Sequence, residues 1–360
     1  MSLIFPRHLL ATLAPVGAVV ALVAGCSSGA PAQVEAGEEA SESGMEVVGE
    51  TVHLGSEGEG VTIGLTYVPS VQFAPVYVAG ADEIFRAAGI GASIRHHGAD
   101  EGLFTALASG EEDVTIATGD EVLQARDSGL DIVAIGAYYH EYPVVIITPE
   151  DSGITTVEGL KGKSVGLPGE YGSNWFGLLA ALDAAGMSVD DIDVVSIGFT
   201  QAASLASGAV DAVVGFINSD AVQLKEMGVP INIIELDPAH VPLVGATIVS
   251  TTDWVERHPE LASGVVGAIT AGAERVIQNP QHALEVSSHW DKSLSDSEVR
   301  ATASEMLKAT IPLWMGPDGK ADATQDLETW EAMAPFLAGV LDMDFTEQMV
   351  EESVTNDYTN

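Results

Sequence analysis

Short apolar runs rich in β-branched residues alternate, from residue 61 onward, with longer segments whose apolar residues recur at helical spacing. This alternation is typical of βαβ units and predicts a largely parallel sheet. In the first half of the pattern we expect strands at 61–67, 92–97, 114–118 and 132–138, and helices at 75–88, 101–109 and 121–128.

The same order of elements returns in the second half. We expect strands at 164–167, 193–197, 212–216 and 231–236, and helices at 174–185, 201–207 and 220–227. The segment 107–110 (LASG) followed by Asp113 returns as 205–208 (LASG) followed by Asp211, with the same offset of 98 residues. Each glycine can take the left-handed conformation that ends a helix. The repeat predicts two similar lobes.

Two further apolar segments stand outside these halves. The segment 142–149 comes after the first half, and the segment 244–250 comes after the second. We interpret them as two crossings between the lobes. One lobe would then comprise residues 61–145 and 245–360, and the other residues 146–244. Helices in 252–360, starting near Thr252 or Asp253, at Pro259 and at Pro280, would pack on the first lobe. A two-domain α/β enzyme without a double crossing is the alternative.

The N-terminal sequence pattern indicates a targeting segment. Arg7 precedes an apolar run at 9–22, which is shorter than the about 20 residues that a transmembrane helix needs. Small residues then lead to Cys26, a pattern that resembles the bacterial lipobox and implies a signal peptide over 1–25 and a lipid on the Cys26 sulfur. An ordinary secretory signal with a buried cysteine is the alternative. Residues 26–60 are polar and acidic, and we expect a disordered tether there.

The chain is strongly acidic, with 13 Lys and Arg against 53 Asp and Glu and a formal net charge of −40. Such a surface repels phosphate backbones and anionic lipid headgroups, so nucleic-acid binding is not expected. Because charge repulsion in so acidic a domain is screened by salt, we hypothesise a salt-rich host. Equal stability of the purified protein in very low and in molar salt would contradict this. Cys26 is the sole cysteine, which excludes an intramolecular disulfide.

Ligands of open parallel sheets bind beyond the carboxyl ends of the strands. Five segments follow predicted strands and would line a cleft between the lobes: 68–74, 119–121, 138–142, 168–175 and 217–219. Nine of the 21 aromatic residues lie in three short segments at these places. Rings with polar edges suit a flat, partly polar ligand. For each of Tyr67, Tyr138 and Trp175, ligand contact and packing are equally open interpretations. Tyr77 and Phe176 are expected to pack inside helix faces.

The segment 166–175 (GLPGEYGSNW) is the most informative of these. A strand ends in a glycine-rich turn, and a helix starts at Ser173 or Asn174, where free N–H groups can bind an acceptor. Glu170 is either a ligand contact or a solvated turn acid. Asp120 and Asn218 follow matched strands 98 residues apart, and each either caps a helix, contacts the ligand, or does both.

Lys and Arg are absent from all five segments, which favours a neutral or weakly charged ligand because sulfonates and phosphates usually recruit arginine. No catalytic set is recognised. His96 and His97 are neighbours on a strand and should point to opposite faces. We therefore predict no catalytic residue, metal or cofactor.

The segment 67–79, the LASG motif with Asp113, the turn 169–172 and the helix after Trp254 resemble substrate-binding proteins of ABC importers, in the group similar to thiamine-pyrimidine synthases. The resemblance implies an α/β type II periplasmic-binding fold: two lobes of mostly parallel sheet flanked by helices, joined by a double-crossover hinge. Carried over, it places Glu170, Tyr171, Gly172, Tyr67 and Phe73 in the pocket. Fungal synthases of this family carry a cysteine cluster, which this chain lacks.

These observations predict a lipid-anchored receptor on the outer face of the cell membrane, monomeric, that presents a flat vitamin or precursor (a thiamine pyrimidine or riboflavin) to an ABC permease and ATPase. Alternatives are a receptor for a small sulfonate or nitrate-like anion, an extracytoplasmic pyrimidine-modifying enzyme, and a sensory or scaffold lipoprotein. The predicted ligand-binding residues are Tyr67, Gln72, Phe73, Asp120, Tyr138, Glu170, Tyr171, Gly172, Ser173, Trp175 and Asn218.

Overall fold

A computed structural model describes residues 49–54, 58–98, 101–237, 240–341, 343 and 345–359. The expected signal peptide and Cys26 lie outside these residues. The described strands are β1 (Thr51–His53), β2 (Glu59–Leu65), β3 (Ile90–His96), β4 (Val114–Thr118), β5 (Ile132–Ala137), β6 (Val144–Pro149), β7 (Ser164–Leu167), β8 (Asp193–Ser196), β9 (Ala212–Phe216), β10 (Ile231–Glu235) and β11 (Ala246–Thr251). The described α-helices are α1 (Ala74–Ala81), α2 (Ile84–Ala87), α3 (Thr105–Ser109), α4 (Gly119–Asp127), α5 (Gly172–Ala184), α6 (Gln201–Ala206), α7 (Asp220–Glu226), α8 (Thr252–Arg257), α9 (Pro259–Gln278), α10 (Pro280–Ser287), α11 (Ser297–Thr310), α12 (Leu327–Leu341) and α13 (Glu347–Ser353).

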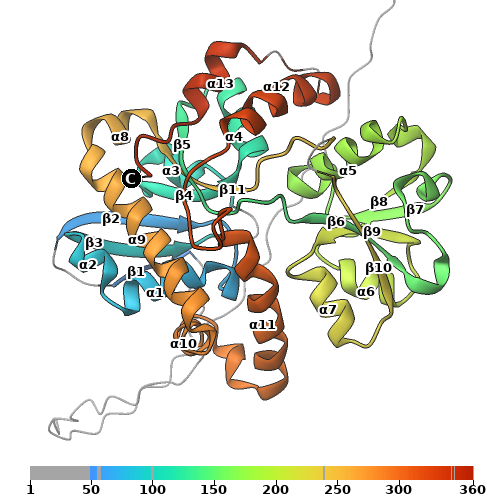
Figure 1. Cartoon of the computed structure of the whole chain (residues 1–360), viewed down its shortest axis with the longest axis horizontal. Helices are drawn as coiled ribbons and strands as arrows, with labels where there is room; N and C mark the ends of the chain where they lie inside the picture. The colour runs from blue at the N-terminus through green and yellow to red at the C-terminus, as the bar shows by residue number, and fades with distance from the viewer. Residues whose placement is uncertain are drawn as a thin grey trace, which may run out of the picture. The chain divides into compact units, whose positions relative to one another are not determined.

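The strands form two sheets, one of six strands in the order β1-β3-β2-β4-β11-β5 and one of five in the order β10-β6-β9-β7-β8. In the first sheet β2 pairs in parallel with β3 and β4, and in the second β7 pairs in parallel with β8 and β9. The strands β6 and β11 run antiparallel to both of their neighbours. Figure 1 shows the connections β5–β6 and β10–β11 running between the two groups of strands. The chain therefore leaves the first sheet once and returns to it once.

The repeated LASG motif ends a helix and ties two strands together in each half. Gly110 and Gly208 both have positive φ and follow α3 and α6. Asp113 then accepts a hydrogen bond from the backbone N–H of Thr62 in β2 at 2.8 Å, and Asp211 accepts one from Ser164 N–H in β7 at 2.9 Å. The repeat is therefore structural, because each aspartate joins the start of one parallel strand to the next.

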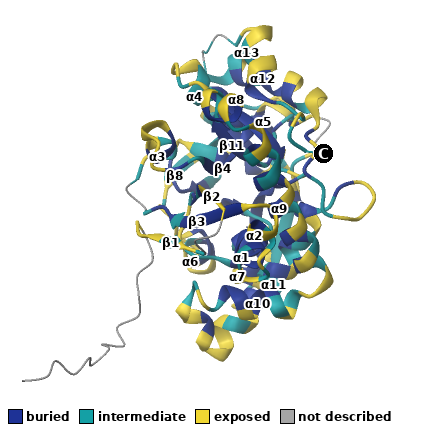
Figure 2. Cartoon of the chain, turned by 90° about the vertical axis from the view of Figure 1, so that its left-hand side faces the viewer, coloured by how far each residue is buried: buried dark blue, intermediate teal, exposed yellow. Residues whose placement is uncertain are grey.

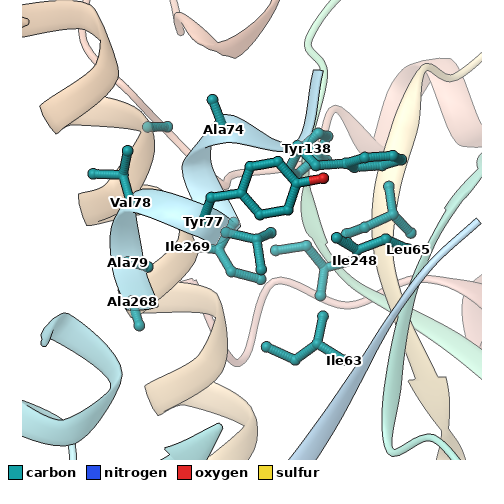
Figure 3. Close-up of a cluster of buried hydrophobic side chains, with 14 of the residues drawn as sticks. Ile63, Leu65, Ala74, Tyr77, Val78, Ala79, Tyr138, Ile248, Ala268 and Ile269 are labelled. Carbon is teal, nitrogen blue, oxygen red and sulfur yellow. The ribbon is translucent and has the colours of Figure 1, made fainter. Parts of the chain in front are cut away.

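The central strands are buried on both faces, which explains their continuous apolar runs. Figure 2 shows β3 and β4 almost wholly in the buried colour. On one face of the first sheet, Ile63 and Leu65 pack with residues of α1 and α9, as Figure 3 shows. The helices α8 to α11 contribute to this same cluster, whereas α12 and α13 pack with α4 and β5. The C-terminal helices thus return to the first sheet, as expected.

Several boundaries differ from the sequence-based expectation, and two of the differences change which elements are present. The tether was expected to extend to residue 60, but Thr51–His53 pairs antiparallel with β3 and β2 begins at Glu59. This edge strand forms because the backbone of β3 offers free hydrogen-bonding groups along that side. The single helix expected at 75–88 is two helices, since Glu83 has a φ of 59° between them. None of the helices in the described part of the chain is long and apolar enough to cross a bilayer.

Candidate functional site

Loops at the carboxyl ends of β2, β4, β5, β7 and β9 form the candidate site. These are the five segments that the sequence indicated, and the strand directions place the loops of each sheet at one edge of that sheet. Apolar packing brings the two edges together: Phe176 and Ala180 of α5 belong to the same buried cluster as Leu123 of α4 and Trp330 of α12.

The first contact between the lobes joins the N-termini of α4 and α5. Thr118 caps α4 in a capping box, its hydroxyl donating to Glu121 Oε2 at 2.8 Å. Since that hydroxyl proton is used, Ser173 Oγ donates to Thr118 Oγ1, 3.2 Å away. Gly172, with a φ of 66°, begins α5 just before the start predicted at Ser173 or Asn174. The conformation of Gly172 lets the turn of one lobe meet a helix N-terminus of the other.

Asp120 is fully buried beside this contact. Its Oδ2 lies 3.2 Å from the Tyr142 hydroxyl, which also lies 2.8 Å from the carbonyl oxygen of Ser173. Burial and the neighbouring Glu121 carboxylate raise the pKa of Asp120 to about 7, because both disfavour the charged form. Burial also raises the pKa of Glu121.

Asn218 occupies the equivalent place after β9 and is also fully buried. Its Nδ2 donates to Thr310 Oγ1 of α11 at 3.0 Å, which joins the second lobe to the C-terminal helices. The Asn218 amide also lies near the Tyr139 hydroxyl, where it partly offsets the burial that raises the pKa of Tyr139. The capping interpretation is wrong for both residues: Thr118 caps α4, and Ser219 is the residue before α7.

Tyr67 and Phe199 approach each other from opposite lobes. Tyr67 follows β2, and its ring centroid lies 6.5 Å from that of Phe199 in an edge-to-face arrangement. The two side chains are 48% and 63% exposed, which makes them available to a ligand or to solvent. Burial and the Asp220 carboxylate raise the pKa of Tyr67. Phe199 was missed by the sequence analysis because it follows β8, a strand whose end was not included among the candidate loops.

A relay of three hydrogen bonds holds the loop after β2. Ser70 N–H donates to Tyr77 Oη at 3.4 Å, and His96 Nδ1 lies 2.8 Å from the Tyr67 carbonyl oxygen. His96 Nδ1 must therefore carry the proton, so Nε2 accepts from the Tyr77 hydroxyl at 2.9 Å. The Tyr77 ring stacks on Trp290 with centroids 5.0 Å apart. This relay fixes both ends of the Tyr67–Ser70 loop.

His96 and Tyr77 are positioning residues that the sequence analysis did not assign. Burial lowers the pKa of His96 to about 4, which keeps the imidazole neutral as the relay requires. His97 contacts Glu112 instead, at 2.8 Å, so the two histidines do face opposite ways. The expected opposite orientation of these two neighbours was the one sequence feature that could have indicated that His96 points into the core below the loop.

The remaining predicted residues do not all converge. Glu170 and Tyr171 are exposed, and the Tyr171 ring folds back over Gly169.

Other predicted residues are turned into the core. Tyr138 is buried against Tyr139 and Trp314, and its hydroxyl donates to the Gln72 carbonyl oxygen at 2.7 Å. Phe73 is buried edge-on to His96, and half-buried Trp175 packs with apolar residues of both lobes. Tyr77 and Phe176 are core residues, as expected.

A separate groove of about 500 Å³ lies at the opposite ends of β2 and β4. It is lined by the end of α3, by Asp113 just before β4, and by residues of α8 and α9, including Trp254 and Arg257. Several residues that suggested the family resemblance therefore lie away from the strand-end loops.

Two α/β lobes joined by two crossings, with loops meeting at their strand ends, define a two-lobed binding protein. The fold agrees with solved structures: that of the periplasmic aliphatic sulphonate binding protein SsuA from Escherichia coli superposes with a TM-score of 0.66 and 17% identity, over 83% of this chain and 99% of that one. At this identity the likeness shows the fold, which is that of periplasmic binding proteins.

The NMT1/THI5 like family model matches residues 70–283, and the chain belongs to this family. Riboflavin-binding protein RibY from Chloroflexus aurantiacus is 31% identical over 71% of this chain and 72% of its own length. A formylaminopyrimidine-binding protein from Halalkalibacterium halodurans is 25% identical over 78% and 84%. A 4-amino-5-hydroxymethyl-2-methylpyrimidine phosphate synthase from Uromyces fabae is 25% identical over 58% and 64%. The family thus includes proteins named for binding and for synthesis.

Proposed function

We propose that this protein is the extracytoplasmic solute-binding component of an ABC importer, and that it holds a flat heterocyclic vitamin or precursor, riboflavin or a thiamine pyrimidine, between its lobes. The observation that carries the proposal is the meeting of ring-bearing and hydrogen-bonding loops from both sheets at Thr118–Ser173 and Tyr67–Phe199. Closure of two lobes over a ligand is the working motion of this architecture. The names of the two binding relatives support the ligand class.

The proposed binding residues are those predicted above, with Phe199 added and with Phe73 and Tyr138 left out because their rings are buried in the core. Tyr67 and Phe199 would contact the faces of the heterocycle, and Asp120, Ser173 and Asn218 would contact its edges. Glu170 and Tyr171 would join only if the exposed turn moves toward the ligand as the lobes close. A lipid on Cys26 would anchor the monomeric receptor beside its permease and ATPase.

The synthase names favour one further candidate, an enzyme acting on a pyrimidine. Against it, the chain carries no cysteine beyond Cys26 to match the cluster of the fungal enzymes. Conversion of an added pyrimidine during incubation with the protein would support the enzyme, and its quantitative recovery would support the receptor.

Thermal unfolding with added ligand tests the proposal. Riboflavin or 4-amino-5-hydroxymethyl-2-methylpyrimidine at about 100 times its dissociation constant should stabilise the folded protein by about 2.7 kcal/mol. A small alkanesulfonate, which finds no Lys or Arg in the strand-end loops, should leave the melting temperature unchanged. Stabilisation by the sulfonate alone, or by none of the three, would contradict the proposal.

A further inference from the structure

Two fully buried side-chain oxygens at equivalent places in the two lobes have no hydrogen-bond partner among the residues that the structure describes. They are Asp120 Oδ1 after β4 and Asn218 Oδ1 after β9. A buried acceptor left unpaired is costly and needs an explanation. Other unpaired atoms occur among the described side chains, but these two lie 98 residues apart at matched strand ends of the candidate site.

The orientation of the Asn218 amide follows from its neighbours. Thr310 Oγ1 donates its proton to the Met306 carbonyl oxygen at 2.7 Å, so toward Asn218 it can only accept. The group that faces Thr310 must therefore be the amide nitrogen, as the 3.0 Å contact has it. Asn218 Oδ1 is thus an acceptor that no described side chain uses.

Asp120 presents an acceptor in either protonation state. Its Oδ2 is engaged with the Tyr142 hydroxyl, whose shorter contact is with the Ser173 carbonyl oxygen. If the carboxyl is neutral, its proton lies on Oδ2 and reaches the Tyr142 oxygen, and Oδ1 is a carbonyl oxygen. If the carboxyl is charged, Oδ1 is a carboxylate oxygen. In both states Oδ1 can accept a hydrogen bond.

We infer that Asp120 Oδ1 and Asn218 Oδ1 are the groups, one from each lobe, that recognise N–H donors on two edges of the ligand. The inference rests on the proposed function and narrows it to an uncharged or cationic heterocycle carrying N–H or NH₂ groups. Both oxygens are buried where the lobes meet, so the ligand reaches them when the lobes separate. An anion would place its own acceptor atoms against these two acceptors, and it would find no Lys or Arg in these loops.

Paired analogues test the inference on the unmodified protein. Riboflavin carries one imide N–H, and 3-methylriboflavin lacks it. The aminopyrimidine named above carries an NH₂ group, and its N,N-dimethyl form lacks both hydrogens. For the parent that binds, removing the donor should weaken binding at least ~10-fold, because an acceptor is left buried and unpaired. Calorimetric titration measures both members of each pair.

Variants assign the donor to one lobe. Methylation of the donor should weaken binding less than ~3-fold in the variant that lacks the acceptor for that donor. That variant is Asp120→Ala if the donor meets the first lobe and Asn218→Ala if it meets the second. Asp127→Ala, at an exposed position in the same helix as Asp120, serves as the control and should keep the full penalty. Equal binding of a parent and its methylated analogue to the wild-type protein, or a full penalty in both variants, would overturn the inference and leave the receptor proposal standing. Failure of both parents to bind would overturn both.

Discussion

Gly272→Ala is expected to destabilise the protein by about 3 kcal/mol, although alanine is the better helix former. Gly272 lies in α9, where a Cβ would meet the Pro75 carbonyl oxygen at 2.1 Å and the Ala79 Cβ at 3.1 Å. The first of these atoms is backbone, so α1 or α9 must shift, and overpacking of this kind costs about 1–3 kcal/mol or more. Figure 3 shows Ala268 and Ile269 of α9 against Val78 and Ala79 of α1. Chemical denaturation measures the change.

Gly267→Ala is the matched control in the same helix. Gly267 is exposed, and a Cβ there would meet nothing within 4 Å. Because glycine costs about 1 kcal/mol relative to alanine in a helix, this variant should be slightly more stable than the wild type. Equal effects of the two substitutions would show that α1 and α9 do not approach as closely as described.

Acidification from pH 6.5 to about 4 is expected to remove about 3 kcal/mol of folding free energy through His96 alone. Burial lowers the pKa of His96 to about 4 in the folded protein, from an ordinary value of 6.5. The unfolded chain therefore binds a proton first, so the contribution is full above pH 7 and is lost as the pH falls. Protonation of Nε2 would also remove the acceptor of the Tyr77 hydroxyl.

His96→Gln should accordingly flatten the fall in unfolding free energy between pH 6.5 and 4. Denaturant titrations of wild type and variant at several pH values give the difference. The exposed His289→Gln, also near Trp290 in sequence, should follow the wild-type curve. A wild-type slope retained by His96→Gln would mean that other groups govern the acid limb.

The strands from β2 onward, their order along the chain and the repeat could be predicted from local pattern, whereas β1 was not predicted. Apolar runs bounded by glycine and acidic residues marked 114–118, 164–167 and 212–216, and all three have the predicted bounds. The LASG motif was informative because a left-handed glycine and a strand-starting aspartate act over a few residues. Helix starts were predicted less accurately, and the break at Glu83 was not predicted. The backbone conformation at a helix end depends on the residues that pack against it, which local pattern does not reveal.

The candidate site could be predicted as a set of loops but only partly as a set of side chains. Asp120, Asn218, Ser173 and Tyr67 lie at contacts between the lobes, whereas Tyr138 and Phe73 are turned into the core. Aromatic residues at strand ends suit both places equally, so their type alone could not decide between them.

Chain composition and periodicity by themselves predicted two α/β halves, two crossings between them and five of the loops that follow strands, because hydrophobic spacing reports which faces are buried. Tertiary structure alone decided which oxygens stay unpaired, which tyrosines are core, and that Phe199 meets Tyr67. These outcomes depend on partners 55 residues apart at Thr118–Ser173 and 92 apart at Asn218–Thr310, and no local pattern encodes which distant residues will meet.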